Sequence, residues 1–407
     1  MTGRRYTVIS ADTHAGGSHE QYREYLDPEW REEFDAWRGQ YKNPWKDLRD
    51  TDLRVRNWDD DRRDADQLRD GVVGEVVFPN TVPPFYPAFV LFARPPKNQD
   101  EYVHRRAGIK AHNRWLADFC ARRPERRAGI GQIFLNDIDD AIEDLHFIKE
   151  HGLRGGILLP NVAPDIDWVQ PIYHPDYDRL WAVIQDLDIV VNVHGGTGNP
   201  NYGKHPFASM IMVTETMFYS TRPFSQLILS GVFERFPRLK MAVTETAVRD
   251  FPQTIAYMDD VVQRVNSGAI GELKYTADQG LKRLPSEYVR DNVWFGASFP
   301  LRTDIEARHL LGADKIMWGN DYPHDEGTGP YSRETLRQVA HDVPEAEMRM
   351  LLGENAAKLY GFDLAALQPI ADEWGPTIEE LQVPLTELPA EPNEALLKEA
   401  RRQTAVA

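Results

Sequence analysis

The sequence predicts one (β/α)8 barrel that carries an insertion and a C-terminal extension. Short β-rich runs alternate with amphipathic helical segments through most of the 407 residues, a pattern typical of a parallel sheet with crossover helices. Such barrels occupy about 250 residues and tolerate long loop insertions, so the length fits one decorated domain. A dinucleotide-binding sheet is not favoured, because no Gly-x-Gly-x-x-Gly turn follows the first strand.

Eight runs are the candidate strands of this barrel. In chain order they are residues 6–11, 72–78, 128–135, 155–159, 189–194, 239–245, 292–298 and 315–319. Helical periodicity recurs between them: Leu145 and Ile148 continue an apolar face begun by Ile138 and Ile142, and Gly152 then stands where a C-cap belongs. Eight strands with interleaved helices favour a closed barrel over an open sheet.

Two regions lie outside this alternation. Residues 18–70, between the first two strands, are rich in Asp, Arg and Trp, the tryptophans being Trp30, Trp37, Trp45 and Trp58. This insertion either covers the substrate or forms a flap packed by its own aromatic side chains. From residue 370 the chain is rich in Pro and Glu, so we expect a barrel domain over residues 1–369 and an extended or partly ordered extension over 370–407.

Composition excludes some partners. The chain has 64 acidic and 47 basic residues, and its net charge of −17 opposes binding to nucleic acid or to anionic membranes. The single cysteine, Cys120, can form no internal disulfide, and the apolar run near the N-terminus is too short for a signal-peptide core. We therefore expect a cytoplasmic protein that acts on a small molecule and, as is common, forms a homo-oligomer.

Side chains of metal-ligand types end several of the predicted strands, which is where barrel enzymes collect their chemistry. Asp12 and His14 share one side of the first strand, because side chains alternate along a strand. His194 ends the fifth strand and is followed by two glycines that leave space, although a histidine there can also be a core residue bonded to a carbonyl. Glu245 and Asp321 end the sixth and eighth strands. Five such residues predict a metal centre, because unpaired charges at a barrel mouth are costly.

Motifs along most of the chain point in the same direction. They are residues 12–14, 191–196, 235–239, 318–324 and 352–356. Together they resemble the amidohydrolase-related branch of the amidohydrolase superfamily, over residues 5–362. The resemblance implies a distorted TIM barrel of the metal-dependent hydrolase type with ligands at Asp12, His14, His194 and Asp321. It also implies that Asp321 is the acid/base that handles the proton of metal-bound water.

Three departures from that family pattern bear on the metal. The usual His-x-His of the first strand is Asp-x-His here, the histidine often found after the sixth strand is Glu245, and residues 158–161 contain no lysine that could be carboxylated and bridge two zinc ions. Two histidines and three carboxylates form an oxygen-rich ligand set that suits iron or manganese. We expect one or two Fe²⁺ ions, with Mn²⁺ or Zn²⁺ as alternatives.

The segment 14–20 resembles a diterpenoid-tailoring branch of TIM-barrel non-heme di-iron monooxygenases. This resemblance implies that O₂ is activated and that an apolar terpenoid or lipid is hydroxylated, with acyl-CoA as the favoured form. Glu20 and His324 would then complete a second iron site, with Glu215 as a further candidate, unless they only hydrogen-bond to the ligands. Asp321 and His324 are the expected catalytic residues.

Two other functions use the same residues. One is a mononuclear metal hydrolase or non-oxidative decarboxylase, in which Asp321 is the general acid/base. The other is a barrel that only binds its ligand, with vestigial metal ligands.

Substrate contacts are expected from the loop after the second strand. Asn80 is the polar candidate, and Phe85 either lines an apolar pocket or packs against the insertion. A CoA tail would need basic residues, and four lie in the insertion, unless they form a solvated face: Lys42, Lys46, Arg54 and Arg56.

Overall fold

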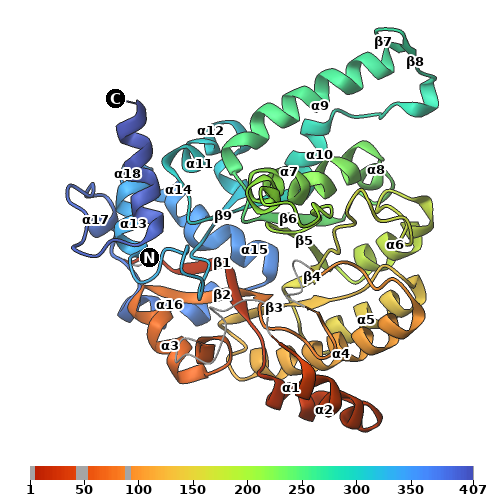
Figure 1. The fold of residues 1–407 in the computed structure, drawn as a ribbon. Helices are drawn as coiled ribbons and strands as arrows, with labels where there is room; N and C mark the ends of the chain where they lie inside the picture. Colours follow the sequence, from red (N-terminus) through yellow and green to blue (C-terminus); the bar gives the residue numbers. More distant parts are fainter. Residues whose placement is uncertain (1–4, 43–53, 88–92, 407) are drawn as a thin grey trace.

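Eight parallel strands form a nearly closed barrel in the computed structural model, which describes residues 5–42, 54–87 and 93–406 (Figure 1). The strands are β1 (Val8–Ala15), β2 (Val72–Pro79), β3 (Arg127–Gln132), β4 (Gly156–Leu158), β5 (Val190–His194), β6 (Lys240–Thr244), β9 (Val293–Ser298) and β10 (Ile316–Gly319). They pair in this order. The segment after β10 then meets β1, where the Asp321 amide donates to the Asp12 carbonyl over 2.9 Å. The predicted fold class is confirmed.

Helices surround the barrel on the outside. They are α1 (His19–Tyr25), α2 (Arg31–Gln40), α3 (Asp60–Arg69), α4 (Gln99–Ala121), α5 (Ile138–Glu150), α6 (Asp178–Asp186), α7 (Ala208–Leu229), α8 (Val232–Arg235), α9 (Phe251–Asn266), α10 (Pro285–Asn292), α11 (Arg302–Glu306), α12 (Arg308–Leu311), α13 (Ser332–Ala340), α14 (Glu345–Arg349), α15 (Asn355–Tyr360), α16 (Leu364–Trp374), α17 (Ile378–Leu381) and α18 (Glu394–Val406). A two-stranded hairpin, β7 (Ala269–Ile270) and β8 (Leu273–Lys274), follows α9.

Alternation along each strand separates an inner from an outer core. On β3, Ala128 and Ile130 belong to the apolar cluster inside the barrel. Gly129 and Gly131 face the helices instead, and a Cβ at Gly131 would lie 2.6 Å from the Ile148 side chain of α5. The small residues on the outer face let α4 and α5 pack directly against the sheet. The same alternation turns Gln132 inward at the end of β3.

The first strand is longer than predicted. β1 runs to Ala15, and its pairing with β2 is irregular between Ser10 and Thr13. Two residues of β1, Ala11 and Asp12, oppose the single residue Val76 of β2 there, which is a bulge, and bulges are common where a strand must re-aim a side chain next to an active site. Asp12 and His14 therefore lie within the strand.

The described parts of the insertion and of the extension are both folded. The insertion contributes α1, α2 and α3, and the tryptophans 30, 37 and 58 lie among the described residues, whereas Trp45 lies outside them. In the extension, for which the sequence predicts an extended or partly ordered tail, residue 370 falls within α16, and α18 buries Leu396 completely against the domain. The Pro and Glu content reflects short connections and solvated helix faces.

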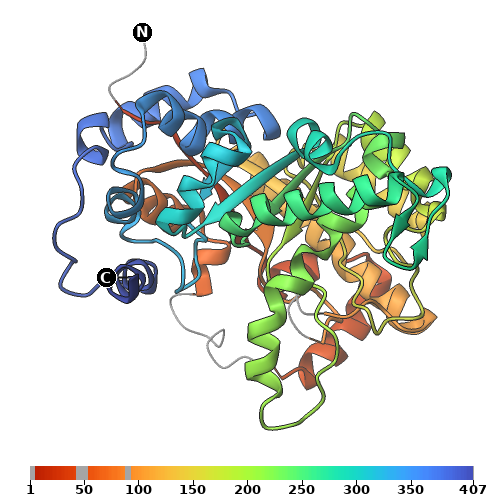
Figure 2. The same cartoon turned by 90° about the horizontal axis from the view of Figure 1, so that it is seen from above.

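One helix extends well beyond the barrel. Figure 2 shows α7 and the loop before it standing away from the strands. Its exposed face carries Met210, Val213 and Phe218, each more than 60% exposed. Among the described residues, no helix is long and apolar enough to cross a membrane.

Candidate metal centre

Four side chains meet at the C-terminal rim of the barrel: Asp12 and His14 from β1, His194 from β5, and Asp321 just after β10. We call them the rim cluster. None is more than 1% exposed. Their convergence follows from the parallel sheet, in which all strands end at the same rim.

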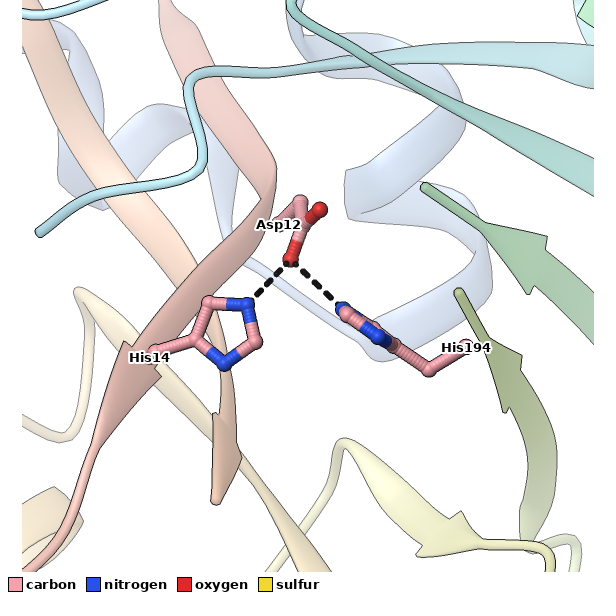
Figure 3. A group of neighbouring side chains, drawn as sticks. All are labelled: Asp12, His14 and His194. Carbon is pink, nitrogen blue, oxygen red and sulfur yellow. Dashed lines mark hydrogen bonds and ion pairs between the residues drawn. The ribbon is translucent and has the colours of Figure 1, made fainter. Parts of the chain in front are cut away.

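Asp12 is the centre of the cluster. Its Oδ1 lies 3.3 Å from His14 Nε2 and 3.4 Å from His194 Nε2. Figure 3 shows both imidazole rings turned toward this one carboxylate oxygen. The other oxygen, Oδ2, accepts a hydrogen bond from the Ser298 hydroxyl at the end of β9. The carboxylate is thereby fixed while its inner edge faces the two histidines.

Asp321 and Glu245 reach the rim through unusual backbone. Both have left-handed φ, 57° and 54°, although neither is glycine. Such backbone costs about 1–3 kcal/mol and persists where the surroundings hold it, most often at functional sites. Asp321 Oδ1 lies 3.2 Å from His14 Nε2 and 2.9 Å from His324 Nδ1. Glu245 Oε2 lies 3.2 Å from Nδ1 of His194, the ring nitrogen that points away from Asp12.

Close packing against Glu245 explains the glycine that follows His194. A Cβ at Gly195 would lie 2.5 Å from the Glu245 carbonyl oxygen and 2.7 Å from its carboxylate. The glycine therefore lets Glu245 approach Nδ1 of His194. A carboxylate at this nitrogen orients the imidazole ring of a metal-binding histidine.

Two buried atoms of the cluster have no hydrogen-bond partner among the described residues, namely Nε2 of His14 and Oδ2 of Asp321. Buried polar atoms are normally satisfied, so both point to a bound group. Ligand atoms of Asp12, His14 and His194 all lie within 4.8 Å of one another, and those of His14, Asp321 and His324 do so as well. Imidazole nitrogens with several carboxylate oxygens fit a divalent metal such as manganese.

Electrostatics also favour a cation here. Burial alone would lower the pKa of His14, but its contacts with Asp12 and Asp321 outweigh burial and raise that pKa to about 10. Burial raises the pKa of Glu245 to about 8 against the opposing effect of His194, and Asp321 and Asp12 add to the rise. Both shifts come from crowding carboxylates in a buried site, where a positive charge relieves their repulsion.

His324 and Asn80 extend the cluster toward solvent. His324 contacts Asp321 through Nδ1 and Asn80 Oδ1 through Nε2, the latter over 3.0 Å. Its side chain is 26% exposed, whereas Asp321 is fully buried. The structure thus brings together Asp12, His14, His194, Asp321, His324, Asn80 and Glu245, seven of the residues expected at the site.

Two of the expected site residues lie elsewhere. Glu20 is on α1 with its side chain 64% exposed and paired with Arg38. Helix α1 begins with a capping box of Ser18 and Gln21, which sets its register and turns Glu20 outward. Phe85 packs against Trp30, Phe34 and Trp37 of the insertion, at ring distances of 5.8–6.3 Å. Phe85 therefore packs against the insertion, the second of the two roles considered for it from the sequence.

The remaining candidates that the structure describes have contacts outside the cluster. Glu215 on α7 accepts a hydrogen bond from Tyr202 over 2.7 Å. Of the basic residues considered for a CoA tail, Arg54 lies over Trp58 and Arg56 over Tyr322, while Lys46 falls outside the described residues. Lys42 is exposed.

Sequence reasoning missed Ser298 and Arg63. Ser298 is a polar residue at the end of β9, the same position that marks the other cluster residues. A serine hydroxyl is a less typical metal ligand than a carboxylate or an imidazole, so the strand-end pattern alone does not select it. Arg63, on α3 of the insertion, donates to the His14 carbonyl over 2.8 Å and is fully buried. No local pattern marks it, because it reaches β1 only through the tertiary fold.

A family model described as amidohydrolase matches residues 42–362, most of the chain. The chain belongs to the amidohydrolase family. The superfamily resemblance drawn from the motifs is therefore confirmed.

Curated relatives of this family member are decarboxylases. Gamma-resorcylate decarboxylase from Rhizobium sp. is 26% identical over 222 residues, which are 52% of this chain and 64% of that protein. The aligned region thus spans less than two thirds of that relative. The enzyme of the same name from Rhodococcus jostii is 26% identical over 264 residues, 61% of this chain and 74% of that protein.

Solved structures share the fold over nearly their whole length. A 5-carboxyvanillate decarboxylase from Novosphingobium aromaticivorans, complexed with manganese and 4-hydroxy-3-methoxy-5-nitrobenzoic acid, has a TM-score of 0.65 at 19% identity and covers 88% of this chain and 97% of its own. A dihydroxybenzoic acid decarboxylase from Polaromonas, with manganese and 2-nitroresorcinol, has a TM-score of 0.62 at 18% identity and covers 88% and 97%.

These relatives correct the expected reaction. The prediction of a non-heme di-iron monooxygenase is wrong, since the similar proteins are non-oxidative decarboxylases, the class given as its alternative. Iron as the first choice of metal, O₂ as a partner and an acyl-CoA substrate find no support in them. The manganese alternative agrees with the metal of both solved structures.

Proposed function

We propose that this amidohydrolase-family member is a manganese-dependent, non-oxidative decarboxylase of a hydroxylated aromatic acid. The observation that carries the proposal is the rim cluster itself, in which buried His14 Nε2 and Asp321 Oδ2 form no hydrogen bond with the described residues. The similarity to aromatic-acid decarboxylases supports the choice of reaction.

Asp12, His14, His194 and Asp321 would hold the metal. When bound, manganese supplies a positive charge that polarises an acid substrate and fixes its orientation. Ser298 and Glu245 hold Asp12 and His194 in place through their outer atoms. The four side chains are buried, and burial strengthens the charge interactions among them.

In the reaction, the bond between the ring carbon and the carboxylate breaks and CO₂ leaves. The electron pair stays on the ring carbon, which takes up one proton. Asp321 is placed to give that proton, because its Oδ2 is free while Oδ1 contacts His324 over 2.9 Å. His324 is partly exposed and connects Asp321 with solvent, so it restores the proton after each turnover.

Carbon dioxide release tests the proposed function. Protein stripped of metal and reloaded with manganese is expected to convert 2,6-dihydroxybenzoate or 5-carboxyvanillate to the decarboxylated phenol with stoichiometric CO₂, without oxygen uptake. The chelated protein should be inactive until manganese is restored. Oxygen consumption with a hydroxylated product, or failure to release CO₂ across a panel of hydroxybenzoates, would overturn the proposal.

Ser298→Ala is expected to weaken manganese binding by about 10- to 100-fold, the usual effect of losing an outer partner of a ligand. The reason is that Asp12 Oδ2 loses its buried hydroxyl donor. Titration of metal-free protein with manganese, followed by calorimetry, measures the change. Ser230→Ala, at the end of α7 and outside the cluster, is the control and should bind manganese as the wild type does.

A further inference from the structure

A pocket with a volume of about 80 Å³ opens on the same rim, at the ends of β3, β4 and β5. Its lining includes Tyr86, Arg105, Gln132, Phe134, Leu158, Asn161 and Thr197. Thr197 joins it to the rim cluster, because its hydroxyl donates to the His194 carbonyl over 2.8 Å. The pocket and the rim cluster are therefore connected through the segment that follows β5.

Arg105 brings a buried positive charge to this pocket. The residue is 6% exposed, and its guanidinium lies over the rings of Tyr86 and Phe134 at 4.4 and 5.4 Å. Nη1 donates to the Arg94 carbonyl over 2.8 Å, and Nε has no partner within the described part of the chain. Among the described residues it contacts the Tyr86 side chain, the Phe134 ring and one backbone carbonyl, and it forms no ion pair with a carboxylate.

The neighbouring arginine, Arg106, is paired with carboxylates, unlike Arg105. Arg106, on the same helix α4, forms ion pairs with Asp140, Glu143 and Asp144 at 3.0–3.4 Å. Burying a cation without a negative partner is costly, so proteins pair such charges or use them to bind anions. The guanidinium of Arg105 is a planar fork that suits a carboxylate.

Gln132 adds a second unsatisfied group. It is 3% exposed, it faces into the barrel, and neither Nε2 nor Oε1 has a partner among the described residues. The Asn161 Oδ1 atom, also in the pocket lining, is likewise unpartnered. Phe134 and Leu158 supply apolar wall between these polar atoms. Such a pocket, apolar with a few convergent polar groups, fits an aromatic ring that carries polar substituents.

We propose that Arg105 and Gln132 bind a second carboxylate on the substrate, so that the preferred substrates are hydroxylated aromatic dicarboxylates. This inference rests on the proposed decarboxylase function. One carboxylate lies at the rim cluster and leaves as CO₂, while the other is held in the pocket and stays on the product. Arg105 and Gln132 thus recognise the far end of the aromatic ring. They do not contact the carboxylate that leaves as CO₂.

Calorimetric titration of the manganese-loaded protein tests the proposal with two probes that differ by one carboxylate. Wild type is expected to bind 4-hydroxyisophthalate about 10- to 100-fold more tightly than salicylate, the range of a charge-assisted hydrogen-bonded pair. Arg105→Met should remove this preference and leave salicylate binding within about twofold. Arg106→Met, which removes an arginine outside the pocket, should keep the preference.

Equal binding of the two probes by wild type would overturn the inference, and so would an Arg105→Met variant that weakens both probes equally. If Arg105→Met does not fold, Gln132→Leu serves in the same titration, and an unchanged preference in it counts against the proposal. The proposed decarboxylase function is tested separately, by measuring CO₂ release. A preference that depends on Arg105 without any CO₂ would support the binding inference and refute the decarboxylase function.

Discussion

Asp321→Asn is expected to lower kcat for decarboxylation by about 10²- to 10⁴-fold, the usual contribution of a positioned acid. Asparagine preserves the size of the side chain, but it has no proton to give to the ring carbon and no negative charge for a metal. It also loses the carboxylate that contacts both His14 and His324. The loss should therefore appear in kcat and in manganese affinity together.

The measurement is steady-state CO₂ release at saturating manganese, with the bound metal determined on the same sample. Asp325→Asn is the matched control, since this aspartate is 90% exposed four residues further along the chain, and its kcat should stay within about twofold of wild type. An Asp321→Asn protein that keeps manganese and more than a tenth of the wild-type kcat would show that another group delivers the proton.

The strand-end rule found most of the cluster from sequence. Asp12, His14, His194 and Asp321 each end or follow an apolar run, and parallel strands bring such ends to one rim. These positions are determined by short-range alternation, which a single sequence displays. The eight strands were found for the same reason, although their ends shift by a few residues.

Residues outside the strands could not be placed in this way. Glu20 and Phe85 lie in or against the insertion, whose packing depends on contacts far along the chain. The reaction was wrongly predicted because the same ligands serve oxygen activation and decarboxylation, and the segment 14–20 that favoured the former runs from the end of β1 into the start of that insertion. Gln132 ends a strand but is not a ligand type, so its meaning depends on Arg105 from a distant helix.

A buried ion network connects the insertion to the barrel and has a large expected effect on stability. Glu75 of β2 contacts Arg63 over 2.8 Å and Arg127 over 3.2 Å. All three side chains are at most 8% exposed. Arg63 in turn donates to the His14 carbonyl, so the network also holds the backbone of one residue of the rim cluster.

Glu75→Gln is expected to lower the free energy of unfolding by about 3–5 kcal/mol, because it leaves two buried guanidinium groups without their shared carboxylate. Denaturant titration at pH 7 measures this change. Glu150→Gln, at the exposed end of α5, should change it by less than about 0.5 kcal/mol. A loss below about 1 kcal/mol for Glu75→Gln would mean that water or other acids replace the carboxylate.

The pH dependence gives a second, independent readout. Burial alone would raise the pKa of Glu75, but Arg63 and Arg127 outweigh it and lower that pKa from 4.5 to about 2. A lowered pKa in the folded state means that the carboxylate stabilises the protein above pH 4.5, and that this stabilisation is lost as the pH falls toward 2. The difference in stability between wild type and Glu75→Gln should therefore be largest at neutral pH and shrink through that acidic range. A difference that stays constant down to pH 3 would show that the side chain acts through packing instead of charge.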